Sequence, residues 1–242
     1  MDRSDPGGST VPRELRESVA AIQRSFVGHC SVDVTVWSRT SVHQLLALHD
    51  AELAHIYSRI NPQFPALLAD VARVALMLRF GGVYNDVSYR FKDVGALCSM
   101  LRLLRRYDAV FETHPKEPRM RNTNMAAARP NLDVFRDCLL LMKRELALRL
   151  RLQAAGAARD AESGRVLYGI GSRTLIRLVT NNGTMRLGAH GAAEGVYGSG
   201  RMRVMRWGRL LSWDRAFKRR VNANVTSGED VHWSRLQRPL FV

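Results

Sequence analysis

Two aspartates and one arginine stand close together in a stretch of the sequence that is otherwise mostly apolar. Asp70 and Arg73 are three positions apart, and Asp86 follows thirteen positions after Arg73. Residues three apart lie on one face of a helix, so Asp70 and Arg73 could present a carboxylate and a guanidinium to one ligand. Carboxylate oxygens such as those of Asp86 also suit a hard cation such as Mn²⁺ or Mg²⁺. The spacing therefore indicates one ligand shared by Asp70 and Arg73, and Asp86 is a further candidate for binding.

The elements that must position these residues are a helix, a tight turn and a short strand. Apolar residues recur at steps of three and four between Leu67 and Leu78, which predicts a helix. Gly81 and Gly82 follow, at the point where a helix end needs a residue that is free to take positive φ. A β-prone run comes next, and Asp86 stands at its carboxyl end, where open α/β sheets bind ligands.

The rest of the chain predicts strands that alternate with helices, which favours one α/β domain over residues 11–242 behind a disordered leader at 1–10. Ser41 is the expected N-cap of a helix that ends before Asn61. The region 184–200 is rich in glycine and has little periodicity. We expect helices at 12–26, 41–60, 67–80, 95–106, 133–152 and 172–181, and strands at 31–37, 83–86, 108–113, 122–128 and 202–207.

Composition narrows the class of protein. The sequence has no run of eighteen apolar residues, and its N-terminus has no apolar signal region, so we expect a protein without a transmembrane segment. The three cysteines, Cys30, Cys98 and Cys138, are widely spaced and fit a reducing, cytoplasmic compartment better than a disulfide framework. The net charge of +15 would suit nucleic acid or an anionic surface, but arginine supplies nearly all of it and no nucleic-acid motif accompanies it.

The stretch around Asp86 resembles the sugar-binding DxD region of a glycosyltransferase family. That family includes capsular and mannosyl-type transferases and, more distantly, the large clostridial toxin glucosyltransferases. Its signature is Asp-x-x-Arg on a helix, followed by Gly-Gly-x-Tyr-x-Asp-x-Asp. The matching positions, in order and at the family's spacing, are Asp70, Arg73, Gly81, Gly82, Tyr84 and Asp86. The resemblance implies a GT-A-like, Rossmann-like mixed sheet flanked by helices, in a bacterial, retaining transferase that uses a nucleotide-sugar donor.

The same resemblance assigns roles to these residues. Asp70 and Arg73 would bind sugar hydroxyls and Asp86 would orient the ribose or a metal ion, so these three would be the catalytic residues. Gly82 and Tyr84 would belong to the donor-binding set, with Tyr84 as a buried support for the acidic turn. A divalent cation or fixed positive charge would stabilise the leaving diphosphate.

Downstream segments extend the resemblance over most of the chain. Residues 122–130 are similar to the segment whose asparagine contacts the donor sugar, and the alignment does not decide between Asn122 and Asn124. The turn at 168–171 occupies the place of the family's Thr-Gly-Pro turn, and residues 231–234 are similar to a late segment that closes over the diphosphate and metal. The similarity of this late segment implies that Trp233 binds the donor and that His232 and Ser234 are metal ligands.

Two departures from the family pattern weaken the expectation of activity. Ser88 stands where the second aspartate is expected, and a hydroxyl is a poorer ligand for Mn²⁺ or Mg²⁺ than a carboxylate. A metal would then depend on Asp86, Ser88, His232 and Ser234, or on Glu229 or Asp230. The family's first strand, which holds the nucleotide base, is missing before Pro12, so we expect a shortened gene product, a protein that begins upstream of the given start, or an inactive one.

These observations leave three functions to distinguish. The first is transfer of a sugar from a nucleotide donor to a polysaccharide, lipid or protein acceptor. The second is a catalytically inactive relative that acts as a binding or scaffold protein. The third, from another class, is a basic protein that binds nucleic acid or an anionic surface.

Overall fold

The computed structural model describes residues 13–28, 32–86, 89–91, 94–113, 120–156, 170–181, 193–205 and 211–213. The helices are α1 (Arg13–Phe26), α2 (Arg39–His49), α3 (Ala51–Arg59), α4 (Pro65–Phe80), α5 (Val94–Leu103), α6 (Asp133–Ala154) and α8 (Ser172–Asn181). The strands are β1 (Gly82–Asn85), β2 (Tyr89–Phe91), β3 (Ala109–Thr113), β4 (Met120–Ala127), β5 (Ala193–Tyr197), β6 (Gly200–Met205) and β7 (Leu211–Trp213). The α/β class is confirmed.

A mixed sheet forms the centre of the described part of the chain. Five described strands form this sheet in the order β1-β4-β3-β6-β5, and β2 pairs with β7 in a separate two-stranded sheet. The β3–β6 pair is parallel, whereas β1–β4, β3–β4 and β5–β6 are antiparallel. Strands β1, β3 and β6 therefore run in the same direction, and their carboxyl ends meet at one edge of the sheet.

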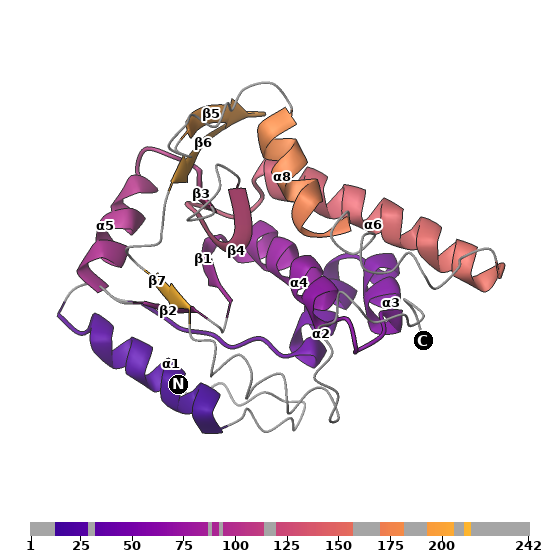
Figure 1. The fold of residues 1–242 in the computed structure, drawn as a ribbon, viewed down its shortest axis with the longest axis horizontal. Coiled ribbons are helices and arrows are strands. Elements are labelled where there is room, and N and C mark those ends of the chain that lie inside the picture. The colour runs from indigo at the N-terminus through magenta and orange to yellow at the C-terminus, as the bar shows by residue number, and fades with distance from the viewer. Residues whose placement is uncertain are drawn as a thin grey trace.

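Helices cover both faces of this sheet, as Figure 1 shows, with α4, α6 and α8 on one side and α1 and α5 on the other. Alternate residues of one strand belong to different cores, because successive side chains of a strand point to opposite faces. Phe111 of β3 and Met125 of β4 lie in the larger core with α4, α6 and α8. Val110 and Ala126 lie in the smaller core beside Leu97 of α5. The structure is thus a three-layer α/β arrangement.

The expected helix, glycine turn and strand are confirmed at the centre of the fold. Helix α4 begins at Pro65, whose fixed φ suits the first helical turn, and nearly every residue from Leu67 to Met77 is buried. Gly81 ends the helix with φ of +66°, and Gly82 has φ of +76°. A Cβ at Gly81 would lie 2.9 Å from the carbonyl carbon of Arg129, so the turn needs glycine for its space as well.

Four expectations about the elements are wrong. Residues 32–38 form no strand ladder with the described strands, although their burial alternates as their sequence does. The helix expected at 41–60 is two helices divided at Asp50, which caps α3 by accepting the amide hydrogen of Leu53. The N-cap of α2 is Ser38 in a capping box, with Ser41 at its third position. The weakly periodic region 184–200 also contains β5.

The cysteines differ from the expectation of reduced thiols. Cys98 is disulfide-bonded, whereas Cys138 is free and buried, and Cys30 lies outside the described residues. The cysteines therefore give no support to a reducing compartment, and a cytoplasmic location remains a prediction. Across the described ranges, none of the helices combines the length and the apolar character that crossing a membrane requires.

Candidate functional site

Helix α4 and the end of β1 bring the predicted acidic and basic residues together. Asp70 and Arg73 lie one turn apart on α4 and are both buried, with 7 % and 4 % of their surfaces exposed. The Nη1 atom of Arg73 lies 2.9 Å from Oδ1 of Asp70, and its Nη2 atom lies 3.3 Å from Oδ1 of Asp86. The expectation that Asp70 and Arg73 share one helix face is confirmed, and the structure adds that Arg73 also contacts Asp86.

Tyr84 connects the strand to this ion-pair cluster. Its hydroxyl donates a hydrogen bond of 2.9 Å to Oδ1 of Asp86. The guanidinium carbon of Arg73 lies 5.4 Å from the centre of its ring, within the range of a cation–π contact. We refer to Asp70, Arg73, Tyr84 and Asp86 as the Arg73 cluster. Within it, the Asp86 side chain keeps 23 % of its surface exposed, so a carboxylate faces solvent beside a buried positive charge.

The surroundings fix the protonation of two members of the Arg73 cluster. Burial disfavours the charged guanidinium, but the carboxylates of Asp86 and Asp70 outweigh that effect and raise the pKa of Arg73. Burial, reinforced by the negative charge of Asp86, raises the pKa of the Tyr84 hydroxyl well above its usual range. Arg73 is therefore a permanent cation, and Tyr84 is a neutral hydrogen-bond donor at every physiological pH.

The turn before α8 packs directly against Asp70. A Cβ placed on Gly171 would lie 1.8 Å from Oδ2 of Asp70 and 2.4 Å from its Cγ, which no real structure would allow. Because Arg73 holds this carboxylate in place, the position requires glycine. The resemblance placed a glycine turn at 168–171, and this contact gives its last residue a physical reason. Gly82, also assigned to donor binding, faces open space and needs glycine for its positive φ alone.

A second polar group lies at the same edge of the sheet. Asn85, directly before Asp86, pairs across β1–β4 with Asn124. The Nδ2 atom of Asn124 donates a 2.6 Å hydrogen bond to Oε2 of Glu112, and both residues are almost fully buried. The period of two along the strands places Asn85 and Asn124 on the side of the smaller core, whereas Tyr84 packs on the larger one. Asn124 is therefore near Asp86 in the sheet but on its other face.

Glu112 is a candidate that the sequence pattern missed. It ends the apolar run Ala109–Phe111 of β3, just as Asp86 follows β1, and the two strands run in the same direction. A carboxylate at the carboxyl end of a buried strand is the signal that could have identified it. The sheet order, which the sequence does not reveal, is what brings Glu112 to the same edge as Asp86.

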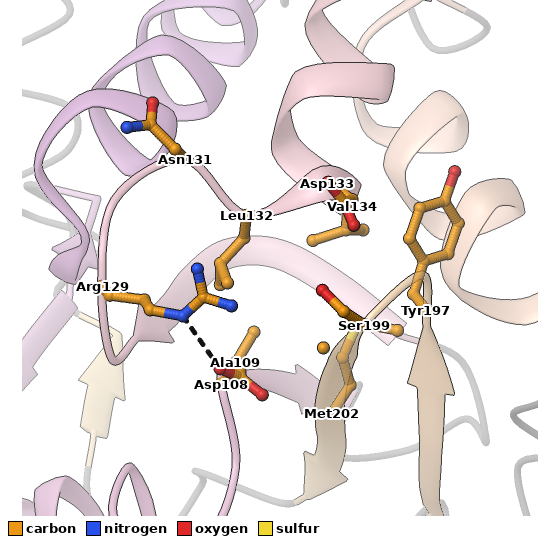
Figure 2. Close-up of a pocket in the computed structure, with 11 residues that line it drawn as sticks. Asp108, Ala109, Arg129, Asn131, Leu132, Asp133, Val134, Tyr197, Ser199 and Met202 are labelled. Carbon is orange, nitrogen blue, oxygen red and sulfur yellow. Dashed lines mark hydrogen bonds and ion pairs between the residues drawn. The ribbon is translucent and has the colours of Figure 1, made fainter.

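A small cavity lies at the opposite end of the sheet and contains none of the predicted site residues. Its volume is about 50 Å³, which suits a few water molecules better than a nucleotide sugar. Figure 2 shows the side chain of Arg129 reaching across it toward Asp108, and the distance from its Nε to Oδ1 of Asp108 is 3.2 Å. The cavity closes against Asp133 at the start of α6 and Gly200 at the start of β6.

Several predicted residues cannot be placed relative to the Arg73 cluster. Ser88, His232, Trp233 and Ser234 lie outside the described residues, and Asn122 is described only as part of β4. Among the residues that the structure does describe, no three His, Cys, Asp or Glu side chains gather where they could hold a metal ion. Within the Arg73 cluster the carboxylate open to solvent is that of Asp86, and the guanidinium of Arg73 lies beside it. This set of groups does not fit Mn²⁺ or Mg²⁺ by itself.

Comparison of the chain with protein-family models, with curated proteins and with solved structures gives no match. The site must therefore be interpreted from its own geometry. Its described part offers a partly exposed carboxylate, a buried permanent cation behind that carboxylate, and a neutral phenol between them. Such a group can accept hydrogen bonds from hydroxyl groups of a ligand through Asp86 while its charge stays balanced.

Proposed function

We propose that the protein is a glycosyltransferase of GT-A type that binds a nucleotide-sugar donor at the edge of the sheet where β1 and β3 end. The observation that carries the proposal is the convergence of Asp70, Arg73, Tyr84 and Asp86, from a helix and a strand, into one connected cluster. The six sequence positions that resemble the DxD region support the same conclusion. A position outside the carboxyl ends of co-directional strands is where open α/β sheets bind ligands.

In this proposal the described residues bind and orient the donor. Asp86 accepts hydrogen bonds from hydroxyl groups of the ribose or the sugar, and the exposed 23 % of its side chain gives it access to them. Arg73 and Tyr84 hold the carboxylate in one orientation, which reduces the entropy lost when the donor is brought into a reactive position. Asp70 balances the charge of Arg73 inside the protein, so that the guanidinium can stay buried behind Asp86.

The leaving diphosphate needs positive charge, and the proposal assigns that role outside the Arg73 cluster. Both terminal nitrogens of Arg73 already contact carboxylates, so its charge is largely balanced. Asp86, Ser88, His232 and Ser234 are the residues that the resemblance implies for a divalent cation. Because Asp86 alone does not fit Mn²⁺ or Mg²⁺, the proposed role of the metal depends on the other three residues, and none of the steps above requires the metal.

A specific observation also favours a second candidate function. Asp70 and Arg73 are almost fully buried and bind each other, which is an arrangement that can hold a fold together without any chemistry. With Ser88 in place of a carboxylate, the protein would then be a folded, inactive relative that binds a ligand or a partner. Both candidate functions are compatible with the same structure, and they differ in whether the protein turns over a donor.

Donor hydrolysis tests both candidates. A panel of nucleotide sugars would be incubated with the protein and Mn²⁺, and the released nucleoside diphosphate would be measured for the parent and for Asp86→Asn. We expect the variant to be slower by about 100-fold, the effect of removing one positioned polar group. Asp33→Asn is the matched control, because Asp33 is an exposed aspartate remote from the cluster in sequence and should not change the rate.

The outcomes separate the candidates. Equal rates for the parent and Asp86→Asn would refute the role of Asp86 in transfer. Donor binding by calorimetry without any turnover, lost in Asp86→Asn, would establish the inactive relative instead. If no nucleotide sugar is either bound or hydrolysed, both candidates fail.

A further inference from the structure

Helix α6 has a second face that the sheet and the neighbouring helices do not use. Its inner face packs into the larger core through Val134, Phe135, Cys138, Met142 and Leu146. On a helical wheel of 100° per residue the outer side of its C-terminal half carries Leu140, Leu141, Arg144, Leu148 and Arg151, and Asp137 lies in the same sector one turn before Leu141. Figure 1 shows α6 along the border of the molecule, with its C-terminal half reaching past α8. We call Leu140, Leu141, Arg144, Leu148 and Arg151 the α6 outer face.

The α6 outer face combines exposed leucine with unneutralised arginine. The exposed fractions are 44 % for Leu140, 40 % for Leu141 and 44 % for Leu148, among the largest apolar exposures of the described residues. Arg144 and Arg151 are also exposed, and within the described ranges neither makes an ion pair. The nearby Glu145 lies at the margin of the face and pairs with Arg149.

We propose that the α6 outer face docks on the surface of an anionic lipid bilayer. A helix that presents leucines together with arginines can insert its apolar groups at the headgroup boundary while its guanidinium groups bind phosphates. The acidic side chain of this sector, Asp137, lies before the face and is engaged by Tyr197 and Arg136. The face runs over twelve residues, which is about 18 Å of helix at 1.5 Å per residue. The net charge of +15 would draw the whole chain to such a surface.

Charge and composition argue against the other occupants. In a symmetric antiparallel contact centred on the α6 outer face, Arg144 of each copy would meet Arg151 of the other, and like charges would face each other. Nucleic acid would use the two arginines but would give the three leucines no partner. An anionic bilayer is the partner that suits both kinds of side chain at once. This inference does not use the Arg73 cluster and is independent of the proposed function.

Flotation of the full chain with lipid vesicles tests this inference. Vesicles of phosphatidylcholine with roughly 30 % phosphatidylglycerol would be compared with phosphatidylcholine alone, at an ionic strength of about 0.1 M. We expect binding to the anionic vesicles, and a loss of at least tenfold in the double variant Arg144→Glu and Arg151→Glu, since each arginine near such a surface contributes roughly fivefold. The double variant Leu141→Gln and Leu148→Gln should also lose binding.

A matched control separates the face from the overall charge. Arg102→Glu with Arg105→Glu makes the same change in net charge at two exposed arginines on and after α5, and we expect less than a threefold effect. An equal loss in this control would overturn the proposal, as would a parent protein that ignores anionic vesicles. Circular dichroism checks that each variant folds. If the leucine variant does not fold, the charge variant alone still decides the test.

The same variants also show whether nucleic acid or a second copy of the chain binds to the α6 outer face instead. If the charge variant loses binding to duplex DNA but keeps its binding to vesicles, nucleic acid is the partner and the proposal is wrong. If the parent sediments as a dimer that either variant dissociates, the face joins two copies and the proposal is wrong as well.

Discussion

Replacing Arg73 with methionine tests the electrostatic account of the Arg73 cluster. The substitution keeps an unbranched side chain but removes the charge that compensates Asp70, which has 7 % of its surface exposed. At the observed 2.9 Å, and with an effective dielectric constant of about 20, the attraction between Arg73 and Asp70 is about 6 kcal/mol before desolvation is subtracted. Removing one partner of such a buried pair leaves the other uncompensated and costs about 3–5 kcal/mol.

The measurement is the free energy of unfolding from urea denaturation followed by circular dichroism. A loss of 3–5 kcal/mol is a large share of the typical 5–15 kcal/mol of a domain, so Arg73→Met should bring the protein close to unfolding. Adding Asp70→Asn should recover part of the loss, because the uncompensated charge is then gone. Arg79→Met, an exposed position on the same helix, is the matched control and should change stability by less than about 0.5 kcal/mol.

Two results would refute this reasoning. One is a cost below about 1 kcal/mol for Arg73→Met, since a buried ion pair cannot be removed from one side so cheaply. The other is strict additivity of Asp70→Asn and Arg73→Met, which would mean that the 2.9 Å contact contributes no coupling.

Two further predictions concern the contact between Gly171 and Asp70 and the titration of the Tyr57 hydroxyl. Gly171→Ala should lower stability by about 1–3 kcal/mol because its Cβ would meet Asp70, whereas Gly200→Ala, whose nearest neighbour lies at an ordinary 3.4 Å, should cost less; equal melting temperatures for the two variants would contradict this. Burial raises the pKa of Tyr57 from its ordinary 10.0 to about 12, so its contribution is complete below pH 10 and is lost as the pH rises to 12. This loss should be about 3 kcal/mol and should be absent in Tyr57→Phe, as measured by unfolding at a series of alkaline pH values.

Periodicity was sufficient for the local elements at the centre of the fold. The apolar spacing of α4 and the paired glycines after it predict a helix and a turn with positive φ, because both depend on the backbone and on nearest neighbours alone. Residues 32–38 show where this reasoning ends. They alternate as a strand does, but a strand also needs a hydrogen-bonded partner, and the described strands supply none. Asp50 likewise divides one expected helix into two through a cap that periodicity does not register.

For the candidate site, too, the sequence predicts one part and tertiary packing decides the rest. The spacing of Asp70 and Arg73 predicts a shared helix face, and that is confirmed at 2.9 Å. Packing between segments far apart in the chain produces the contact of Asp70 with Gly171. It also places Glu112 at the same edge of the sheet as Asp86. No local pattern contains that information, because it depends on which strands become neighbours.

The sequence by itself determined the residue types of the site, the helix and strand that carry them, and the strongly positive charge of the chain. The tertiary structure alone decided that Arg73 is a buried cation held between two carboxylates, with Tyr84 fixed as a neutral donor. It also decided which side of α6 remains exposed. The physical reason is that propensity and spacing act between near neighbours, whereas burial, and with it the strength of each charge, depends on the packing of the whole domain.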